Sequence, residues 1–312
     1  MNSAATTDAA ATADAADAVA ATMLCARVLA DKNAHELDKQ IQFFEEGHKY
    51  VIANDAEQTY TSVTTFIHSL FPGFNAPLII DNMMKGRNWN ASNKYWGMSS
   101  CEIQELWARN GCEAAKAGTQ LHFMIECFMN CSELASAAAA VDYTNEDLYN
   151  HFLRDTRTPE TKTETLEWNY FIHFIRDHPS LKPYRTEWTI HDDELKIAGS
   201  IDMVFENPDG TLSIYDWKRT KEINEKNTFK KFATHPLIAH LPDTNYWHYA
   251  LQLNTYKALL ERKYGKTIAD LYLVRLHPDA EHGDYELILL PDLSKEVGDL
   301  FADRIVAISF KN

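Results

Sequence analysis

The sequence has few cysteines, and none of the five stands in a C-x-x-C pair. The absence of C-x-x-C pairs and the odd number of cysteines favour reduced thiols in an intracellular protein over a disulfide framework. Cys127 and Cys131 are four residues apart, so in a helix they lie one turn apart on the same face. We interpret both of them as packing residues.

Long apolar runs and targeting signals are also missing. No stretch approaches the length of a membrane span, so no membrane partner is expected. Residues 1–25 form a low-complexity tail rich in Ala, Thr and Asp, which lacks the basic n-region of a signal peptide and the arginines of a mitochondrial presequence. We expect this tail to be disordered. The compartment inside the cell is left open.

Two common functional motifs are absent. The chain has no H-E-x-x-H motif and no His-rich cluster, which disfavours other classes of metal hydrolase. The segment "YGKT" at 264–267 ends like a phosphate-binding loop, but Leu260 stands where the first glycine of that loop belongs. The sequence therefore encodes no helicase motor.

Basic charge is scarce overall, with a formal net charge of -15. This value at first argues against a nucleic-acid partner. Most of the negative charge, however, falls in residues 1–60 and 276–304, while the segment 218–231 is rich in Lys and Arg. The net charge therefore excludes little.

Helical and strand patterns alternate along the rest of the chain. From residue 112 they predict a helix, then three strands, an amphipathic helix and a further strand, the last five over 184–191, 195–205, 211–218, 245–265 and 270–278. This αβββαβ order predicts an α/β fold in which one mixed β-sheet is flanked by helices. We expect a single domain over 40–312, with its core at about 112–276 and with helical additions.

Three other segments carry weaker signals. Residues 48–67 have β-rich ends around the polar "NDAEQ", which predicts a hairpin leading into a helix. The helical region 101–130 contains Gly111 and Gly118, two points at which it could be divided. Residues 132–165 are polar and Ala-rich, which predicts an insertion of short helices.

The segment "GSIDMVFENPDGTLSIYDWK" places charged residues in two apolar strands joined by a turn. Asp216 and Lys218 project from one face of their strand, while Trp217 points away. If Glu206 pairs with Leu212, Asp202 falls opposite Asp216. Two such carboxylates with an ammonium beside them either form a structural ion pair or hold a hard cation such as Mg²⁺ or Mn²⁺. For "DWK" alone, the ion pair is the commoner outcome.

Two helices carry further candidates. "GTQLH" puts His122 after Gly118, a glycine expected to let another backbone approach closely, and Glu126 follows one turn later on the same face. "QLNTY" puts Gln252 and Tyr256 on one helical face, the first able to bond phosphate and the second able to stack on a base. A single helical histidine is more often a packing residue than a ligand, so each signal is weak by itself.

Together, "GTQLH", "GSID", "DWK" and "QLNTY" resemble the ordered motifs of the P-D-(D/E)-x-K nuclease superfamily, in its branch of RecB-like and mitochondrial genome-maintenance exonucleases. "TSVTTFIHSLFPGF" is similar to a segment that precedes the core in some members. The resemblance covers roughly residues 48–276. It implies a restriction-endonuclease-like core and metal-dependent hydrolysis of phosphodiester bonds, with DNA and exonuclease action favoured, leaving a 5′-phosphate and a 3′-hydroxyl.

The resemblance also implies roles for individual residues. His122, Asp202 and Asp216 would bind Mg²⁺ or Mn²⁺, with Asp202, Asp216 and Lys218 as the catalytic set. Glu126 is a candidate ligand or supporting residue. Glu187 stands where many members carry another acid, but it equally fits an exposed strand glutamate.

Contacts to DNA are expected from a further set of residues: Gln252, Tyr256, Lys85, Arg87, Arg219 and Lys221. Single-stranded DNA or duplex ends would be the substrate, and any helicase or recombination protein would be a separate partner. Several relatives hold an iron–sulfur cluster with one cysteine before the core and three after it. No cysteine follows Cys131, so no such cluster is expected.

One alternative function comes from another class. A nucleic-acid-binding or scaffold protein could keep this fold without the chemistry. The presence of every motif residue favours the enzyme.

Overall fold

The computed structural model describes residues 27–310 except 45, 48, 56, 138–141, 155–164 and 228. The tail expected to be disordered, residues 1–25, lies outside the described residues. The helices are α2 (Val28–Lys32), α3 (Val63–Ser69), α4 (Ala76–Lys85), α5 (Ser100–Met129), α6 (Ser132–Ala137), α7 (Asn145–Arg154), α8 (Leu166–Asp177), α9 (Asn245–Lys263) and α10 (Ser294–Ser309), with short 3-10 helices at Glu36–Gln40 and Pro236–Ile238. The strands are β1 (Ile41–Phe44), β2 (Lys49–Ile52), β3 (Thr61–Ser62), β4 (Lys182–Asp192), β5 (Ile197–Glu206), β6 (Leu212–Lys218), β7 (Ile268–Arg275) and β8 (Glu286–Leu289).

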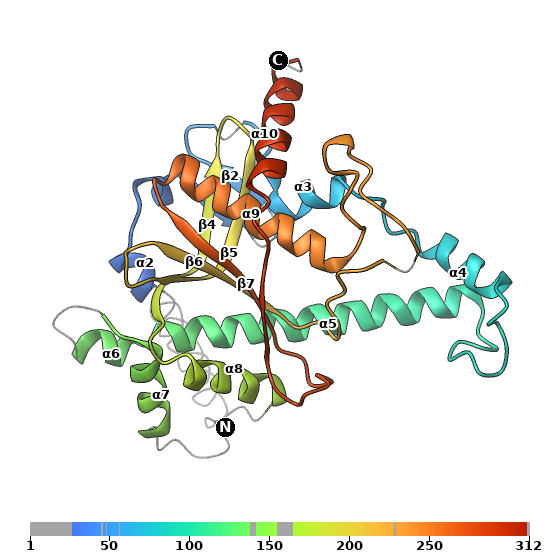
Figure 1. Cartoon of the computed structure of the whole chain (residues 1–312), viewed down its shortest axis with the longest axis horizontal. Helices are drawn as coiled ribbons and strands as arrows, with labels where there is room; N and C mark the ends of the chain where they lie inside the picture. The colour runs from blue at the N-terminus through green and yellow to red at the C-terminus, as the bar shows by residue number, and fades with distance from the viewer. Residues whose placement is uncertain are drawn as a thin grey trace, which may run out of the picture.

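Six strands form one mixed sheet at the centre of the molecule (Figure 1). Strand β5 pairs antiparallel with β4 and β6, β6 pairs parallel with β7, and β7 pairs antiparallel with β8. The short β3 runs parallel to the start of β5. The predicted order of helix, three strands, helix and strand is confirmed as α5, β4–β6, α9 and β7. Helices α6 and α7 lie within 132–165, where an insertion of short helices was predicted, and α8 follows it.

The β5–β6 hairpin has the register that the sequence suggested. Glu206 pairs with Leu212, and the ladder continues to Met203 and Tyr215, where it ends. Beyond that point β5 takes β3 as its neighbour, at Ile197 and Ala198. The two strands therefore separate at the next residues, Asp202 and Asp216, and form a fork.

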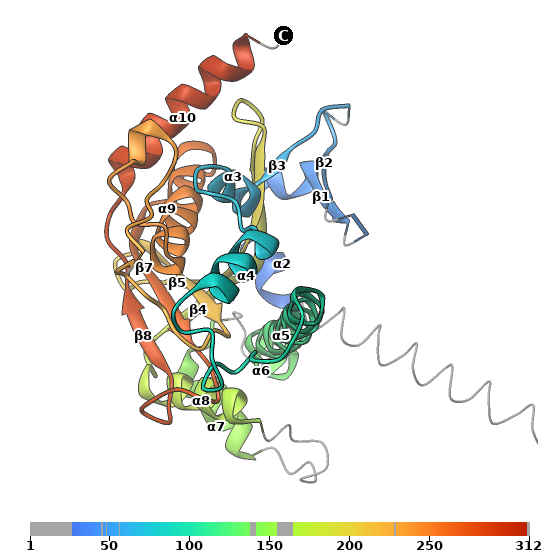
Figure 2. The ribbon, with the colours of Figure 1, turned by 90° about the vertical axis from the view of Figure 1, so that its right-hand side faces the viewer.

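Apolar side chains cover both faces of the sheet. Helices α3, α9 and α10 cover one face and α5 and α8 cover the other (Figure 2). Side-chain alternation along β6 sends Ile214 to the α9 face and Trp217 to the α8 face, where it packs edge-on against Phe171 and Phe174. Asp216 and Lys218 therefore share one face and Trp217 the other, as predicted, and the face of the two charged residues is the one toward α9.

Helix α5 is one uninterrupted helix of 30 residues, about 45 Å long. It starts with a capping box between Ser99 and Glu102. Gly111 and Gly118 do not divide it, although each glycine costs about 1 kcal/mol relative to alanine. Its two ends are anchored by buried residues, Ile103 against α4 and Leu121 against the body, and this packing offsets the cost.

Between those anchors α5 runs through solvent. Residues 108–116 are all exposed, so no face of this segment is covered by the described chain. The helix thus holds α4 away from the sheet (Figure 1). Every described helix is also too short or too polar for a bilayer crossing.

The prediction of a hairpin within residues 48–67 is wrong. Lys49–Ile52 pairs with the preceding strand Ile41–Phe44, and Thr61–Ser62 joins the main sheet beside β5. Ile41, Tyr50 and Ile52 form a small apolar cluster together with Tyr60 and Ala198. The burial of these side chains in one cluster, rather than a turn at "NDAEQ", therefore determines which strand pairs with Lys49–Ile52.

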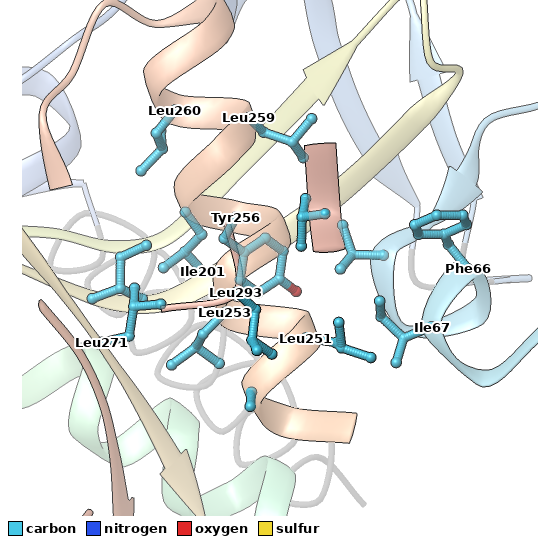
Figure 3. Packing of buried hydrophobic residues seen from close by; sticks show 14 of the residues in the cluster. Phe66, Ile67, Ile201, Leu251, Leu253, Tyr256, Leu259, Leu260, Leu271 and Leu293 are labelled. Atoms are coloured by element: carbon cyan, nitrogen blue, oxygen red, sulfur yellow. The ribbon is translucent and has the colours of Figure 1, made fainter. Parts of the chain in front are cut away.

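Gly199 provides a test of the packing between β5 and α9, the region drawn in Figure 3. A Cβ atom there would lie 2.8 Å from Tyr256 Cε1 and 3.0 Å from Val63 Cγ2. We expect Gly199→Ala to lower the free energy of unfolding by about 1–3 kcal/mol, because the buried Tyr256 ring must move. Gly111→Ala is the matched control, because its Cβ would meet no described atom within 4 Å. It should stabilise the protein by roughly 0.5–1 kcal/mol. Equal denaturation midpoints for both variants would contradict this packing.

Candidate active site

Four elements bring their charged residues to the fork between β5 and β6. His122 comes from α5, Glu187 from β4 and Asp202 from β5, and β6 supplies Asp216 and Lys218. His122 Nδ1 lies 3.6 Å from an Asp202 carboxylate oxygen and 3.8 Å from a Glu187 carboxylate oxygen. Residues separated by up to 96 positions in the sequence therefore face one small volume.

The backbone of Trp217 fixes two of these side chains. Its carbonyl lies 2.9 Å from His122 Nε2 and accepts a hydrogen bond, so that nitrogen carries a proton. Its amide donates to Asp202 Oδ2 at 3.0 Å. Because Nε2 is engaged, the other ring nitrogen, Nδ1, is turned toward the carboxylates.

Glu187 sits at an irregularity in β4. Its φ of 41° lies in the left-handed region, which costs a non-glycine residue about 1–3 kcal/mol. It lies between the paired residues Thr186 and Trp188 and so faces Asp202, while Ser200 Oγ donates to Glu187 Oε2 at 3.0 Å. Of the two interpretations offered by the sequence, the position inside the acidic group is the one observed.

Asp216 and Lys218 form a buried ion pair. Lys218 Nζ lies 2.6 Å from Asp216 Oδ2, and the two side chains are 17% and 2% exposed. Tyr249 of α9 places its ring centroid 4.5 Å from the same ammonium, a cation–π contact. Sequence reasoning missed Tyr249, although it precedes Tyr256 by seven residues, two helical turns along the same face of α9.

The carboxylates lie in a strongly negative environment. Burial, and then the neighbouring Asp202, raise the pKa of Asp216 to about 6. Burial is also the main cause of the raised pKa of Asp202, with Glu187 adding to it. Burial alone would lower the pKa of His122, but Asp202 and Glu187 outweigh it and raise that pKa to about 9. Negative charge is therefore in excess at the fork.

This donor set fits a divalent cation. Ligand atoms of His122, Glu187 and Asp202 all lie within 4.8 Å of one another. The buried carboxylate of Asp216 is close enough for its charge to interact with those of Asp202 and His122. Carboxylate oxygens with one imidazole nitrogen suit Mg²⁺ or Mn²⁺. A cation would also offset the burial and, after it, the carboxylate repulsion that raise the pKa values of the two aspartates.

Glu126 lies beside this group rather than in it. Burial raises its pKa to about 7, and the charge of Glu187 contributes. It is absent from the set of described side chains whose ligand atoms converge.

Gln252 and Tyr256 contact each other on α9. Gln252 Nε2 donates to the Tyr256 hydroxyl at 3.2 Å. The ring of Tyr256 is only 4% exposed and packs over Gly199 and the β-sheet (Figure 3). It therefore offers no open face to a base.

The four basic candidates occupy two regions. Lys85 ends α4 and pairs with Asp81 one turn earlier, and Arg87 follows in the next loop, far from the sheet (Figure 1). Arg219 and Lys221 follow directly after β6, paired with Glu167 at 2.7 Å and Asp279 at 3.6 Å.

One family model matches this chain. Residues 101–306 match the model of the PD-(D/E)XK nuclease superfamily. The chain belongs to the PD-(D/E)XK nuclease superfamily. The six-stranded mixed sheet flanked by helices is accordingly the restriction-endonuclease-like fold of this superfamily. As a nuclease of this type, the protein is a hydrolase of nucleic acids that uses divalent metal ions. No curated protein matches the sequence.

His122 gives the sharpest test of metal binding by this nuclease. We expect Mn²⁺ to raise the melting temperature of the wild-type protein, because the ion binds the folded state. His122→Ala should reduce that rise more for Mn²⁺ than for Mg²⁺, because imidazole suits transition ions better. The measurement is thermal unfolding in each ion and in EDTA.

The matched control is His173→Ala. This histidine also pairs with a carboxylate, that of Asp284 at 3.0 Å, but it lies in α8 and its partner lies in the loop before β8. It should keep the full Mn²⁺ effect. A His122→Ala protein that melts much lower in EDTA yet keeps the full Mn²⁺ rise would show that His122 is a packing residue.

Proposed function

We propose that the protein is a Mg²⁺- or Mn²⁺-dependent DNA exonuclease of the RecB-like and mitochondrial genome-maintenance branch. The observation that carries the proposal is the convergence of His122, Glu187 and Asp202 beside the Asp216–Lys218 pair. The four motifs of that branch, all intact, support the choice of branch. We further propose that 40–312 acts as one nuclease domain inside the cell, with its core at about 112–276.

The proposed roles follow from position and charge. His122, Asp202 and Asp216 hold the ion, Glu187 supports or completes the set, and Glu126 supports Glu187. When bound, the ion supplies Lewis-acid polarisation of the phosphate and activation of water. The Lys218 ammonium orients the attacking water and stabilises negative charge that develops on the phosphate.

Helix α9 supplies the groups next to Lys218. Tyr249 holds the ammonium by its ring face, and Asp216 holds it by charge. Gln252 contacts the DNA backbone through its amide, while the buried Tyr256 acts through Gln252 by fixing that amide. This arrangement replaces the base-stacking role that the sequence suggested for Tyr256.

A path for DNA is supported by the exposed middle of α5. Gly118 was expected to admit another backbone, but a Cβ there would meet no described atom within 4 Å, so no described part of this chain approaches it. We propose that a DNA strand passes over this open surface. Lys85 and Arg87 would contact phosphates at one end of the path, and Arg219 and Lys221 at the other.

The alternative of an inactive binding or scaffold protein has less support. Such a protein would have no need for the buried carboxylate of Asp216 and the mostly covered charges of Asp202 and Lys218, which are costly unless paired or bound to metal.

Exonuclease action has a direct test. End-labelled linear single- and double-stranded DNA, covalently closed circular DNA and RNA are incubated with the protein in Mg²⁺, Mn²⁺ or EDTA. We expect linear DNA to be degraded from its ends with either ion, and circles and EDTA samples to stay intact. Cleavage of closed circles would replace the exonuclease with an endonuclease, and cleavage of RNA alone would overturn the DNA substrate.

Asp216→Asn and Lys218→Ala test the site itself. Each should lower the cleavage rate by about 10²-fold or more, because each removes a charge that acts on the ion or on the phosphate. Lys218→Ala should keep Mn²⁺ binding in calorimetry, whereas Asp216→Asn should weaken it. Full activity of folded Asp216→Asn protein would refute the nuclease mechanism proposed here.

Two substitutions of Tyr249 distinguish a role in positioning Lys218 from simple packing. Tyr249→Phe keeps the ring under the ammonium, so kcat should stay near the wild-type value. Tyr249→Leu keeps apolar bulk but loses the ring, and kcat should fall several-fold with little change in KM. Equal kcat values for both variants would rule out a role in holding Lys218.

A further inference from the structure

A second group of metal-ligating side chains lies outside the nuclease site. Cys131 follows the end of α5, Glu133 lies in the first turn of α6, and His151 lies in the last turn of α7. Their ligand atoms all lie within 4.8 Å of one another. The fold thus gathers a thiol, a carboxylate and an imidazole from three consecutive segments.

The spacing of these atoms suits a tetrahedral ion. Cys131 Sγ lies 3.5 Å from Glu133 Oε2. In a tetrahedral zinc site, Zn–S and Zn–O bonds of about 2.3 and 2.1 Å place the two ligand atoms roughly 3.6 Å apart. The pair already stands at the required separation.

The backbone that presents Cys131 is held firmly. Asn130 is fully buried, and its side-chain amide donates to the Glu126 carbonyl at 2.9 Å and to Thr186 Oγ1 at 2.7 Å. Its side-chain oxygen accepts from the Leu29 amide at 2.9 Å. Because its neighbour is fixed on both sides, Cys131 is preorganised as a ligand.

We propose that Cys131, Glu133 and His151 bind one Zn²⁺ ion, which clasps α6 and α7 to the end of α5. On binding, the Cys131 thiol releases its proton to solvent. The thiolate, the Glu133 carboxylate and the neutral His151 imidazole then fill three positions. Glu133 is exposed, so water completes the fourth. Cys131 also belongs to the apolar cluster on the α8 side of the sheet, as the packing interpretation predicted, and the proposal adds a ligand role to it.

The ligand chemistry separates this zinc clasp from the nuclease site. A thiolate with an imidazole selects Zn²⁺ over Mg²⁺, whereas the carboxylates at the fork favour harder ions. A nucleophilic role for Cys131 finds no support, because burial and the adjacent Glu133 raise the pKa of its thiol. Reactive cysteines instead have a lowered pKa beside a cation.

Cobalt is the probe that tests the proposal. Co²⁺ is added to the metal-free full-length protein, and the absorption spectrum is recorded under reducing conditions. We expect a thiolate-to-cobalt charge-transfer band in the near ultraviolet, intense visible bands of a four-coordinate ion, and loss of both when one equivalent of Zn²⁺ is added. A wild-type protein without the charge-transfer band would overturn the proposal.

Two cysteine variants locate the ligand. Cys131→Ser should abolish the charge-transfer band, and Cys127→Ser, the same change one turn earlier, should leave it intact. The reverse pattern, or a band that survives in Cys131→Ser, refutes the assignment. Asp216→Asn should also keep the band, so the result does not depend on the nuclease mechanism.

Zinc affinity provides a second measurement, which remains informative even if the Cys131→Ser protein folds poorly. His151→Gln should weaken Zn²⁺ binding at least 10-fold and remove most of the rise in melting temperature that Zn²⁺ gives the wild-type protein. Unchanged affinity in His151→Gln would exclude His151 as a ligand and overturn the three-ligand site.

Discussion

The backbone of Trp217 holds the candidate active site together. The antiparallel ladder between β5 and β6 ends at Met203 and Tyr215, so the Trp217 amide and carbonyl that face β5 have no strand partner. Asp202 and His122 occupy them with side-chain hydrogen bonds. The indole of Trp217 is buried against Phe171 and Phe174 on the opposite face. A backbone position anchored in the core therefore sets two of the proposed metal ligands.

Buried charge is the second constraint. Asp216 is buried and Asp202 and Lys218 are mostly covered, and such charged groups destabilise a protein unless attraction and hydrogen bonds compensate. The raised pKa values of Asp216 and Asp202 show that these interactions compensate only part of the cost of burying the two carboxylates. A divalent ion would compensate the rest of this cost. The burial that lowers the stability of the metal-free protein would therefore raise its affinity for the ion. Stability and function are linked through one group of side chains.

Helix α5 connects the parts of the molecule that the proposals concern. It begins beside α4, crosses solvent over 108–116, presents His122 to the fork and ends at the proposed zinc clasp of Cys131, Glu133 and His151. His122 lies about 10 Å along the helix axis from the end of α5 at Met129, and Cys131 follows two residues later. An ion that fixes the end of α5 would therefore steady the helix that positions His122.

The sequence by itself determined the order of elements, the register of the β5–β6 hairpin and the face of Asp216 and Lys218, because local turn residues and a two-residue strand period specify them. Four ordered motifs also indicated the superfamily. Tertiary structure alone decided that Glu187 faces Asp202, that Tyr249 lies under Lys218 and that Tyr256 is buried. It likewise decided that β2 pairs with β1. Each of these depends on contacts between segments distant in the chain or on the burial of a shared apolar cluster, and neither local propensity nor periodicity encodes which distant surface will cover a side chain.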